Sequence, residues 1–167
     1  RDISRRAHQT GHNHNGNMKK DAEIRTEHKS EGLITNANNN AWGDTTKQKS
    51  GVDAHVYTGK VYDYFFHQLN LNSFDNNGST MLSVVEVEVK YGEPCPANAY
   101  WGQGKVNICV GSQDIKSYSG SLDFVAHEWA HGVTSWASDR GRGETLTPHY
   151  ESGALNEAFS DWMAAAV

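Results

Sequence analysis

The sequence predicts an α+β fold, and three patterns predict it. Residues 81–91 alternate apolar and polar side chains with a period of two, as a half-exposed strand does. Residues 52–69 carry an apolar stripe at helical spacing, which is typical of a core-facing helix. Further helical patterns begin near residues 121 and 151. We therefore expect a β-rich part followed by helices.

The composition bounds the class of protein. The 167 residues correspond to one domain or to one lobe of a larger one, and 37% hydrophobic content can support a core. The net charge of −5 is spread out, without a basic stripe, so nucleic acid is not an expected partner. No apolar run has membrane-spanning length and no signal peptide is present, so no membrane association is expected. The chain begins at Arg1 and not at methionine, which indicates processing or excision.

Residues 1–20 are polar, and we expect them to form a flexible N-terminal arm. The spacing of His8, His12 and His14 can bind metal, but no apolar residue anchors them.

We expect residues 21–120 to form a β-rich part with one long helix. Short strands are expected at 21–25 and 32–34, and a second strand pair at 97–110. The remainder, 121–167, contains the two C-terminal helices. Their pattern continues to the last residue without a breaker, so we expect a further lobe beyond it.

Residues 127–131 read H-E-W-A-H, the H-E-x-x-H pattern. On a helix, His127 and His131 project from one face and can bind the same zinc ion, while Glu128 can take a proton from a bound water. The surrounding apolar residues recur at helical spacing, as this geometry needs. An ordinary helix with two solvated histidines is the alternative interpretation.

A second helix at 151–161 offers the missing ligand. Catalytic zinc needs three protein ligands and one open position, and Glu157 can be the third. Asp161 lies one turn further on the same face, where it can accept the N–H of a zinc-bound histidine, and Asn156 can serve the other histidine. The alternative is an amphipathic helix with a solvated acidic face.

These motifs together resemble the thermolysin-like family of zinc metallopeptidases, the thermolysin and vibriolysin group. The resemblance rests on H-E-x-x-H followed by E-S-G-A-L-N-E-A-x-S-D at 151–161, on N-A-Y-W at 98–101, and on the helix from residue 52. It runs from about Asp21 to the C-terminus, without a clear match in 1–20. It implies the N-terminal lobe of such an enzyme, with a mostly antiparallel sheet whose edge strand lines the cleft. The helical C-terminal lobe of the same precursor is absent from this chain.

The resemblance also implies a role for each motif residue. Three residues are the implied zinc ligands: His127, His131 and Glu157. Glu128 is the implied general base. Two residues are implied to orient the histidines: Asp161 and Asn156.

The edge strand is the implied substrate-binding element. An edge has unpaired N–H and C=O groups and can accept a peptide as an added strand. By resemblance, Asn98 and the backbones of Ala99 and Trp101 hold the substrate. Phe124 stands where the family usually has a smaller aliphatic residue in the pocket, so the side-chain preference is expected to differ.

Two further features are predicted with alternatives. Cys95 and Cys109 are the only cysteines, and an even count in a secreted protein favours a disulfide over two buried thiols. Asparagines at 36–40 lie where family members often bind calcium, and Asp123 is a further candidate calcium ligand. Asparagine supplies no charge, so calcium binding at 36–40 would be weak.

The predicted function is that of a secreted, extracellular zinc endopeptidase that hydrolyses protein or peptide substrates through a zinc-activated water. The alternative is a zinc-containing lobe that binds peptides without cleaving them, because the second lobe is missing. An aminopeptidase is a weaker third hypothesis, since no G-x-M-E-N-like segment that would bind a substrate amine is present.

Overall fold

A computed structural model describes most of the chain, as the following ranges: 5–6, 22–29, 32–33, 46–90, 92–95, 98–111, 117–139, 146 and 149–167. Within these ranges the elements are β1 (Arg5–Arg6), β2 (Glu23–His28), β3 (Gly32–Leu33), α1 (Thr46–Leu69), β4 (Met81–Val87), β5 (Val89–Lys90), β6 (Glu93–Pro94), β7 (Ala99–Gly102), β8 (Lys105–Cys109), a 3-10 turn η1 (Tyr118–Gly120), α2 (Leu122–Asp139) and α3 (Tyr150–Ala166). Apart from β1, the predicted N-terminal arm lies outside the described residues, as does the asparagine-rich stretch 36–40.

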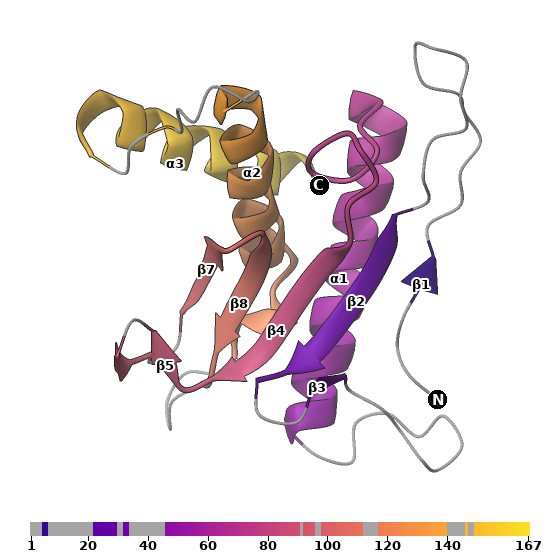
Figure 1. Ribbon diagram of the computed structural model, residues 1–167, viewed down its shortest axis with the longest axis vertical. Coiled ribbons are helices and arrows are strands. Elements are labelled where there is room, and N and C mark those ends of the chain that lie inside the picture. Colours follow the sequence, from indigo (N-terminus) through magenta and orange to yellow (C-terminus); the bar gives the residue numbers. More distant parts are fainter. Residues whose placement is uncertain are drawn as a thin grey trace.

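The main sheet has the order β1-β2-β4-β8-β7, with β3 paired to β2 (Figure 1). The α+β class and the edge position of β7, the strand predicted to bind substrate, are confirmed. The sheet is more mixed than expected: β4 pairs in parallel with both β2 and β8, and antiparallel pairs lie towards the edges. Helix α1 accounts for the β2–β4 pair, because it is long enough to return the chain so that β4 runs in the direction of β2.

The predicted strand 81–91 is divided. Its long part ends at Val87, and β5 pairs with β6 in a separate hairpin. Glu86 has a positive φ of 58°, and the register with β8 shifts between Val84 and Val87. Such a bulge bends a strand and interrupts its alternation. Val84 and Val85 are both buried, so the first part of the strand is covered on both faces and not half-exposed.

The core lies where α1 and α2 cover the sheet. Trp129 of α2 is fully buried, and its Nε1 donates a hydrogen bond to Thr58 Oγ1 of α1 at 3.1 Å. Thr58 in turn contacts Ser83 Oγ of β4 at 2.9 Å. One polar chain therefore ties both helices to the central strand, inside an apolar core that includes Ile24, Tyr62, Phe65, Met81, Val106, Ile108 and Val125.

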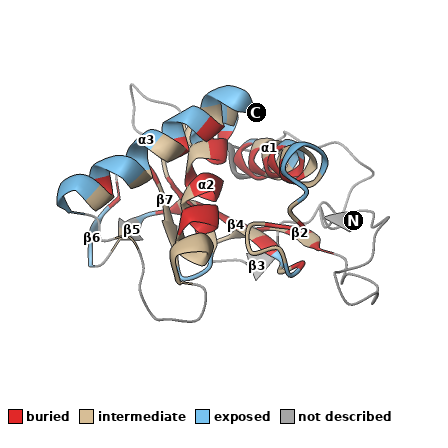
Figure 2. Cartoon of the chain, turned by 90° about the horizontal axis from the view of Figure 1, so that it is seen from above, coloured by how far each residue is buried: buried red, intermediate tan, exposed pale blue. Residues whose placement is uncertain are grey.

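The two C-terminal helices differ in burial. Figure 2 shows α2 largely buried and the outer face of α3 exposed. Leu155 and Trp162 of α3 are 63% and 68% exposed, respectively. The packing of α3 therefore depends on its contacts with α2.

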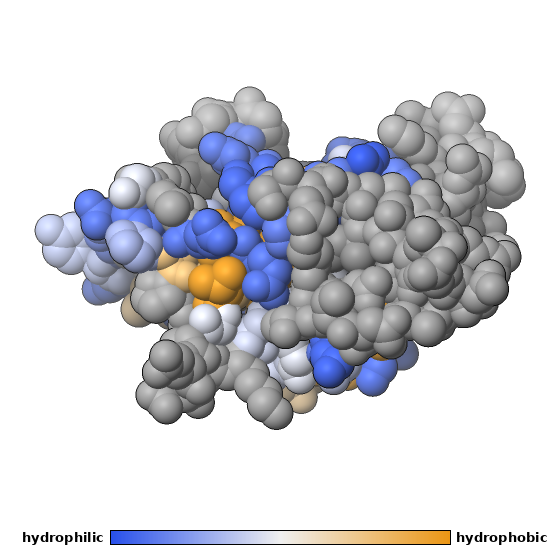
Figure 3. Space-filling model, turned by 90° about the horizontal axis from the view of Figure 1, so that it is seen from below, coloured by the Kyte–Doolittle hydropathy of each residue, from blue (hydrophilic) through white to orange (hydrophobic). Residues whose placement is uncertain are grey.

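Within the described part of the chain, no helix combines the length and apolar character needed to cross a membrane. In the view from below, hydrophilic side chains surround one strongly apolar patch, and smaller apolar areas lie near the edges of the view (Figure 3).

Candidate metal centre

The H-E-x-x-H residues lie in the middle of α2, as predicted. His127 and His131 are one turn apart, and their side chains are 18% and 13% exposed. Their Nε2 atoms are 3.0 Å apart. Because Trp129 and Ala130 on the same helix are fully buried, the core fixes the position from which both imidazoles project.

Glu157 of α3 completes a three-residue group. Its Oε2 lies 3.2 Å from His127 Nε2, and its Oε1 lies 3.6 Å from His131 Nε2. The three ligand atoms all lie within 4.8 Å of one another, so these residues could hold a metal ion. Among the described residues, no other group of three histidine, cysteine or acidic side chains meets this condition.

Each histidine is oriented by a residue of α3. Asp161 Oδ1 lies 2.9 Å from His127 Nδ1, and Asn156 Oδ1 lies 3.1 Å from His131 Nδ1. A carboxylate and an amide oxygen only accept, so both imidazoles donate from Nδ1 and present a lone pair at Nε2. Two lone pairs 3.0 Å apart repel each other unless a proton or a cation lies between them. The donor set therefore fits a metal ion.

Two residues that sequence reasoning missed support this arrangement. Ser160 Oγ lies 3.1 Å from His131 Nδ1, and Thr134 Oγ1 donates to Asn156 Oδ1 at 2.5 Å. Their spacing was a signal, because Thr134 follows His131 by three residues and Ser160 follows Asn156 by four.

Glu128 faces the edge strand. Only 7% of it is exposed, and its Oε2 accepts a hydrogen bond from the Trp101 N–H at 2.7 Å. Burial raises the pKa of the Glu128 carboxyl above its usual range, against the opposing effects of His131, His127 and the Trp101 N–H. The carboxyl is thus held in a poorly hydrated position beside the metal-binding group.

The close approach of α2 to β7 depends on Gly132. A Cβ at this position would lie 3.0 Å from Cη2 of Trp101, a ring that also contacts Phe74 and Trp129. A larger residue would therefore push the helix and the edge strand apart.

The register of β7 fixes which of its backbone groups face outward. Tyr100 is paired with Asn107, and Cys109 N donates to Asn98 O at 2.9 Å. In an antiparallel pair, alternate residues bond to the partner strand, so Ala99 and Trp101 direct their N–H and C=O groups away from β8. Of these, the Ala99 N–H donates to Asn98 Oδ1 at 2.9 Å.

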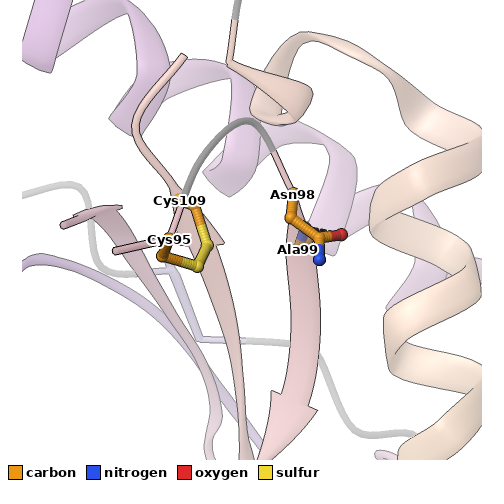
Figure 4. The surroundings of a disulfide bond; sticks show 4 residues. All are labelled: Cys95, Asn98, Ala99 and Cys109. Atoms are coloured by element: carbon orange, nitrogen blue, oxygen red, sulfur yellow. Dashed lines mark hydrogen bonds between the residues drawn. A yellow bond between two sulfur atoms is a disulfide. The ribbon is translucent and has the colours of Figure 1, made fainter. Parts of the chain in front are cut away.

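Both ends of the β7–β8 hairpin are closed. At one end, Gln103 and Gly104 form a two-residue turn in which both have positive φ, as a tight hairpin requires. At the other end, a disulfide joins Cys95 to Cys109, as predicted, with Asn98 and Ala99 beside it (Figure 4). The Cα atoms of the two cysteines are 5.6 Å apart.

A cavity of about 820 Å³ joins these features. It is lined by β7, by the metal-binding face of α2 and by α3, together with Lys90 and Asn98. Phe124 also lines it, and its ring stacks on that of Tyr118 with 4.1 Å between the centroids. The predicted substrate-binding and metal-binding residues therefore share one cavity.

Asp123 has a different environment from the metal-binding group. Its Oδ1 accepts hydrogen bonds from Ser121 Oγ and, at 3.0 Å, from Phe124 N. These bonds, the one from Ser121 foremost, lower the pKa of the Asp123 carboxyl. Its hydrogen bonds are those of a residue in the first helical turn, and its role as a calcium ligand stays a prediction.

Comparison with known proteins gives consistent results. The model for the catalytic domain of thermolysin metallopeptidases matches residues 1–135, including the arm where we expected no resemblance. Bacillolysin from Bacillus amyloliquefaciens is 42% identical over 120 residues, which cover 70% of this chain and 20% of that protein. The neutral protease NprE from Bacillus pumilus is also 42% identical over 120 residues, with 36% of its length covered.

Structural comparison agrees. The precursor of protealysin, a metalloproteinase from Serratia proteamaculans, superposes with a TM-score of 0.66 at 26% identity, over 84% of this chain and 41% of that one. The chain thus spans about a fifth to two fifths of the length of these relatives.

Proposed function

Because the chain belongs to the thermolysin family of metallopeptidases, we propose that it is the zinc-binding lobe of a secreted endopeptidase. One observation carries this proposal: the Nε2 atoms of His127 and His131 and the carboxylate of Glu157 converge next to the buried carboxyl of Glu128. Two imidazoles and one carboxylate are a ligand set of catalytic zinc sites, in which a fourth position stays open.

In this proposal His127, His131 and Glu157 bind the zinc ion. When bound, zinc acts as a Lewis acid and lowers the pKa of water from 15.7 to about 7. Asp161 and Asn156 keep both histidines in the tautomer that presents Nε2, and Ser160 supports His131. Such partners fix the ring orientation and raise the basicity of the ligand.

Glu128 is the proposed general base. Its Oε2 is held by the Trp101 N–H, and we assign Oε1 to the proton of the attacking water. A carboxyl whose pKa is raised by burial is a stronger base than a solvated one, and it can pass the proton on to the leaving amine. The attacking water supplies the new C–O bond as the peptide C–N bond breaks.

The proposed substrate is a peptide in extended conformation beside β7. The outward C=O groups of Ala99 and Trp101 and the Nδ2 donor of Asn98 bind its main chain, which every peptide shares. A second lobe of the same precursor would close the cavity from the side of α3, where Leu155 and Trp162 are exposed. The greater length of the relatives supports this partner.

Two variants test the proposal. Glu157→Ala should lower zinc content after dialysis, because it removes one of three ligands. Glu128→Gln should retain zinc and the fold, yet reduce peptide hydrolysis by the two-lobed protein by about 100- to 10,000-fold. Zinc is measured by elemental analysis and turnover with a peptide substrate.

The outcomes are distinct. Zinc loss in Glu128→Gln would make Glu128 a ligand, and near-normal turnover would assign the proton to another group. A parent protein that binds zinc and peptide without turnover in its two-lobed form would be a peptide-binding lobe instead.

A further inference from the structure

Lys90 lies over the ring of Tyr100 at the cavity. Its Nζ is 4.3 Å from the ring centroid, and both residues line the cavity described above. Lys90 comes from the separate hairpin β5–β6, which follows the bulge that ends the long strand β4. Beyond this bulge the chain leaves the main sheet, and Lys90 lies beside the edge strand.

The hairpin that carries Lys90 is fixed in place. Cys95 N donates to Glu88 O at 2.8 Å, which closes the hairpin, and the disulfide attaches Cys95 to Cys109 of β8. Strand β8 is in turn paired with β7. A continuous set of backbone and covalent bonds thus connects the backbone of Lys90 to that of Tyr100.

Tyr100 belongs to the face of β7 opposite the core. Ala99 is buried and Trp101 packs against Gly132 of α2, so the intervening Tyr100 side chain projects from the other face. A residue of an added strand lies on the same face as the β7 residue that it pairs with. The substrate side chain paired with Tyr100 therefore lies beside Tyr100 and Lys90.

The charges around the cavity make Lys90 distinctive. Among the described residues that line it, Lys90 is the single lysine or arginine. Four acidic side chains line the same cavity: Asp123, Glu128, Glu157 and Asp161. When zinc is bound it offsets the negative charge of the groups around it, whereas Lys90 supplies the positive charge beside Tyr100.

We propose that Lys90 selects an acidic substrate side chain at the position paired with Tyr100. The inference rests on the proposed peptidase function and adds a specificity to it. The ammonium group pairs with the substrate carboxylate, while the Tyr100 ring covers the apolar stem of that side chain. A basic side chain at this position is disfavoured, because it would approach the same ammonium group.

The test uses pairs of peptides that differ only by glutamate against glutamine, with the substitution moved one residue at a time along the peptide. In the zinc-loaded, two-lobed parent, we expect glutamate to be preferred about two- to fivefold in kcat/KM at one position, which is the range for a solvated ion pair. The preference should appear in KM, because the charge pair is the same in ground and transition states. It should weaken as the salt concentration rises.

Three variants read out the contribution of Lys90. Lys90→Gln should abolish the preference and Lys90→Glu should invert it. The control is Lys60→Gln, which removes a lysine that also lies over a tyrosine, with Nζ 5.5 Å from the Tyr57 ring, on α1 and outside the cavity lining. It should leave the preference unchanged.

The affinity of the same peptide pairs is also measured for the zinc-loaded Glu128→Gln variant, with and without Lys90→Gln. This variant is expected to bind the peptides without cleaving them. A parent that cleaves the peptides without a glutamate preference, or whose preference survives Lys90→Gln, overturns the inference and leaves the peptidase proposal intact. Absence of cleavage overturns the peptidase proposal, and the binding arm then decides whether Lys90 discriminates.

Discussion

The two helices that form the metal centre, α2 and α3, are held in opposite ways. Helix α2 is held by the core: Trp129 and Ala130 are fully buried beside the two histidines. Helix α3 presents its metal-binding residues from a largely exposed surface, and the side chains of Glu157 and Asp161 are 63% and 77% exposed. Two of the proposed ligands are thus positioned by packing, and the third is positioned by a helix that packs on one side.

The difference shows how a metal site can be assembled across an interface. The orientation of each imidazole is set by a residue from the other helix, since Asp161 and Asn156 both belong to α3. The hydrogen bonds that set the tautomers therefore also dock α3 onto α2. We expect damage to α2 to appear in the stability of the fold, and damage to α3 to appear in the affinity for the metal.

The largest expected effect is on the unfolding free energy, and it distinguishes a tryptophan of α2 from a tryptophan of α3. Trp129→Ala should destabilise the protein by about 3–5 kcal/mol, because it empties a fully buried site and leaves Thr58 without the indole donor. The matched variant Trp162→Ala on α3 should change the unfolding free energy by less than about 0.5 kcal/mol, since that side chain is exposed. Chemical denaturation of the 167-residue chain measures both. Equal losses would contradict the contrast between the helices.

An intermediate effect is expected from Asp161. Asp161→Ala removes the acceptor of His127 Nδ1, so zinc affinity should fall by about 10- to 100-fold without a change of fold. Titration with a competing chelator gives the affinity, and circular dichroism checks the fold. Glu151→Ala, an exposed acidic residue in the first turn of α3, is the matched control and should retain parental affinity. A normal zinc affinity in Asp161→Ala would mean that α2 alone orients the histidine.

The smallest effect concerns the starts of the two helices. Asp123 accepts bonds in the first turn of α2, whereas the N-cap of α3, His149, makes no side-chain capping bond. Asp123→Ala should cost about 0.3–1 kcal/mol at neutral pH, the range for an acidic residue at a helix N-terminus.

The pH dependence identifies the source of this effect. The pKa of Asp123 is lower in the folded protein than in the unfolded chain, so its ionised form stabilises the fold. That contribution is complete above the unfolded pKa, near 3.8, and is lost as the pH falls through the folded value. The stability difference between variant and parent should therefore shrink below about pH 4. A pH-independent difference would assign it to something other than the carboxylate.

The sequence predicted that His127, His131 and Glu157 lie together because helical spacing is a local property. The i and i+4 positions of His127 and His131 determine a common face, and Glu157, Asn156 and Asp161 follow the same rule on α3. The disulfide and the edge position of β7 were also predicted. Helices α2 and α3 each begin within one residue of the expected start.

The sheet was harder to predict, because pairing joins residues distant in sequence. Alternation in 81–91 could not reveal the positive φ of Glu86, which separates Lys90 from the long strand. Nor could it show that β4 would lie in parallel between β2 and β8. The contact between Lys90 and Tyr100 depends on both features, so no local pattern predicted it.

The open edge of β7 has a consequence for solubility. An edge that accepts the main chain of any peptide also accepts strands of other unfolded or partly unfolded copies, which is how edge-to-edge aggregation begins. Here the edge is only four residues long, and the tight turn at one end and the disulfide at the other prevent it from lengthening. A strand from another copy that pairs with this edge would gain few backbone hydrogen bonds and could not extend the sheet much further. In the proposed peptidase, the short edge that binds a substrate peptide would also limit polymerisation of the protein through that edge.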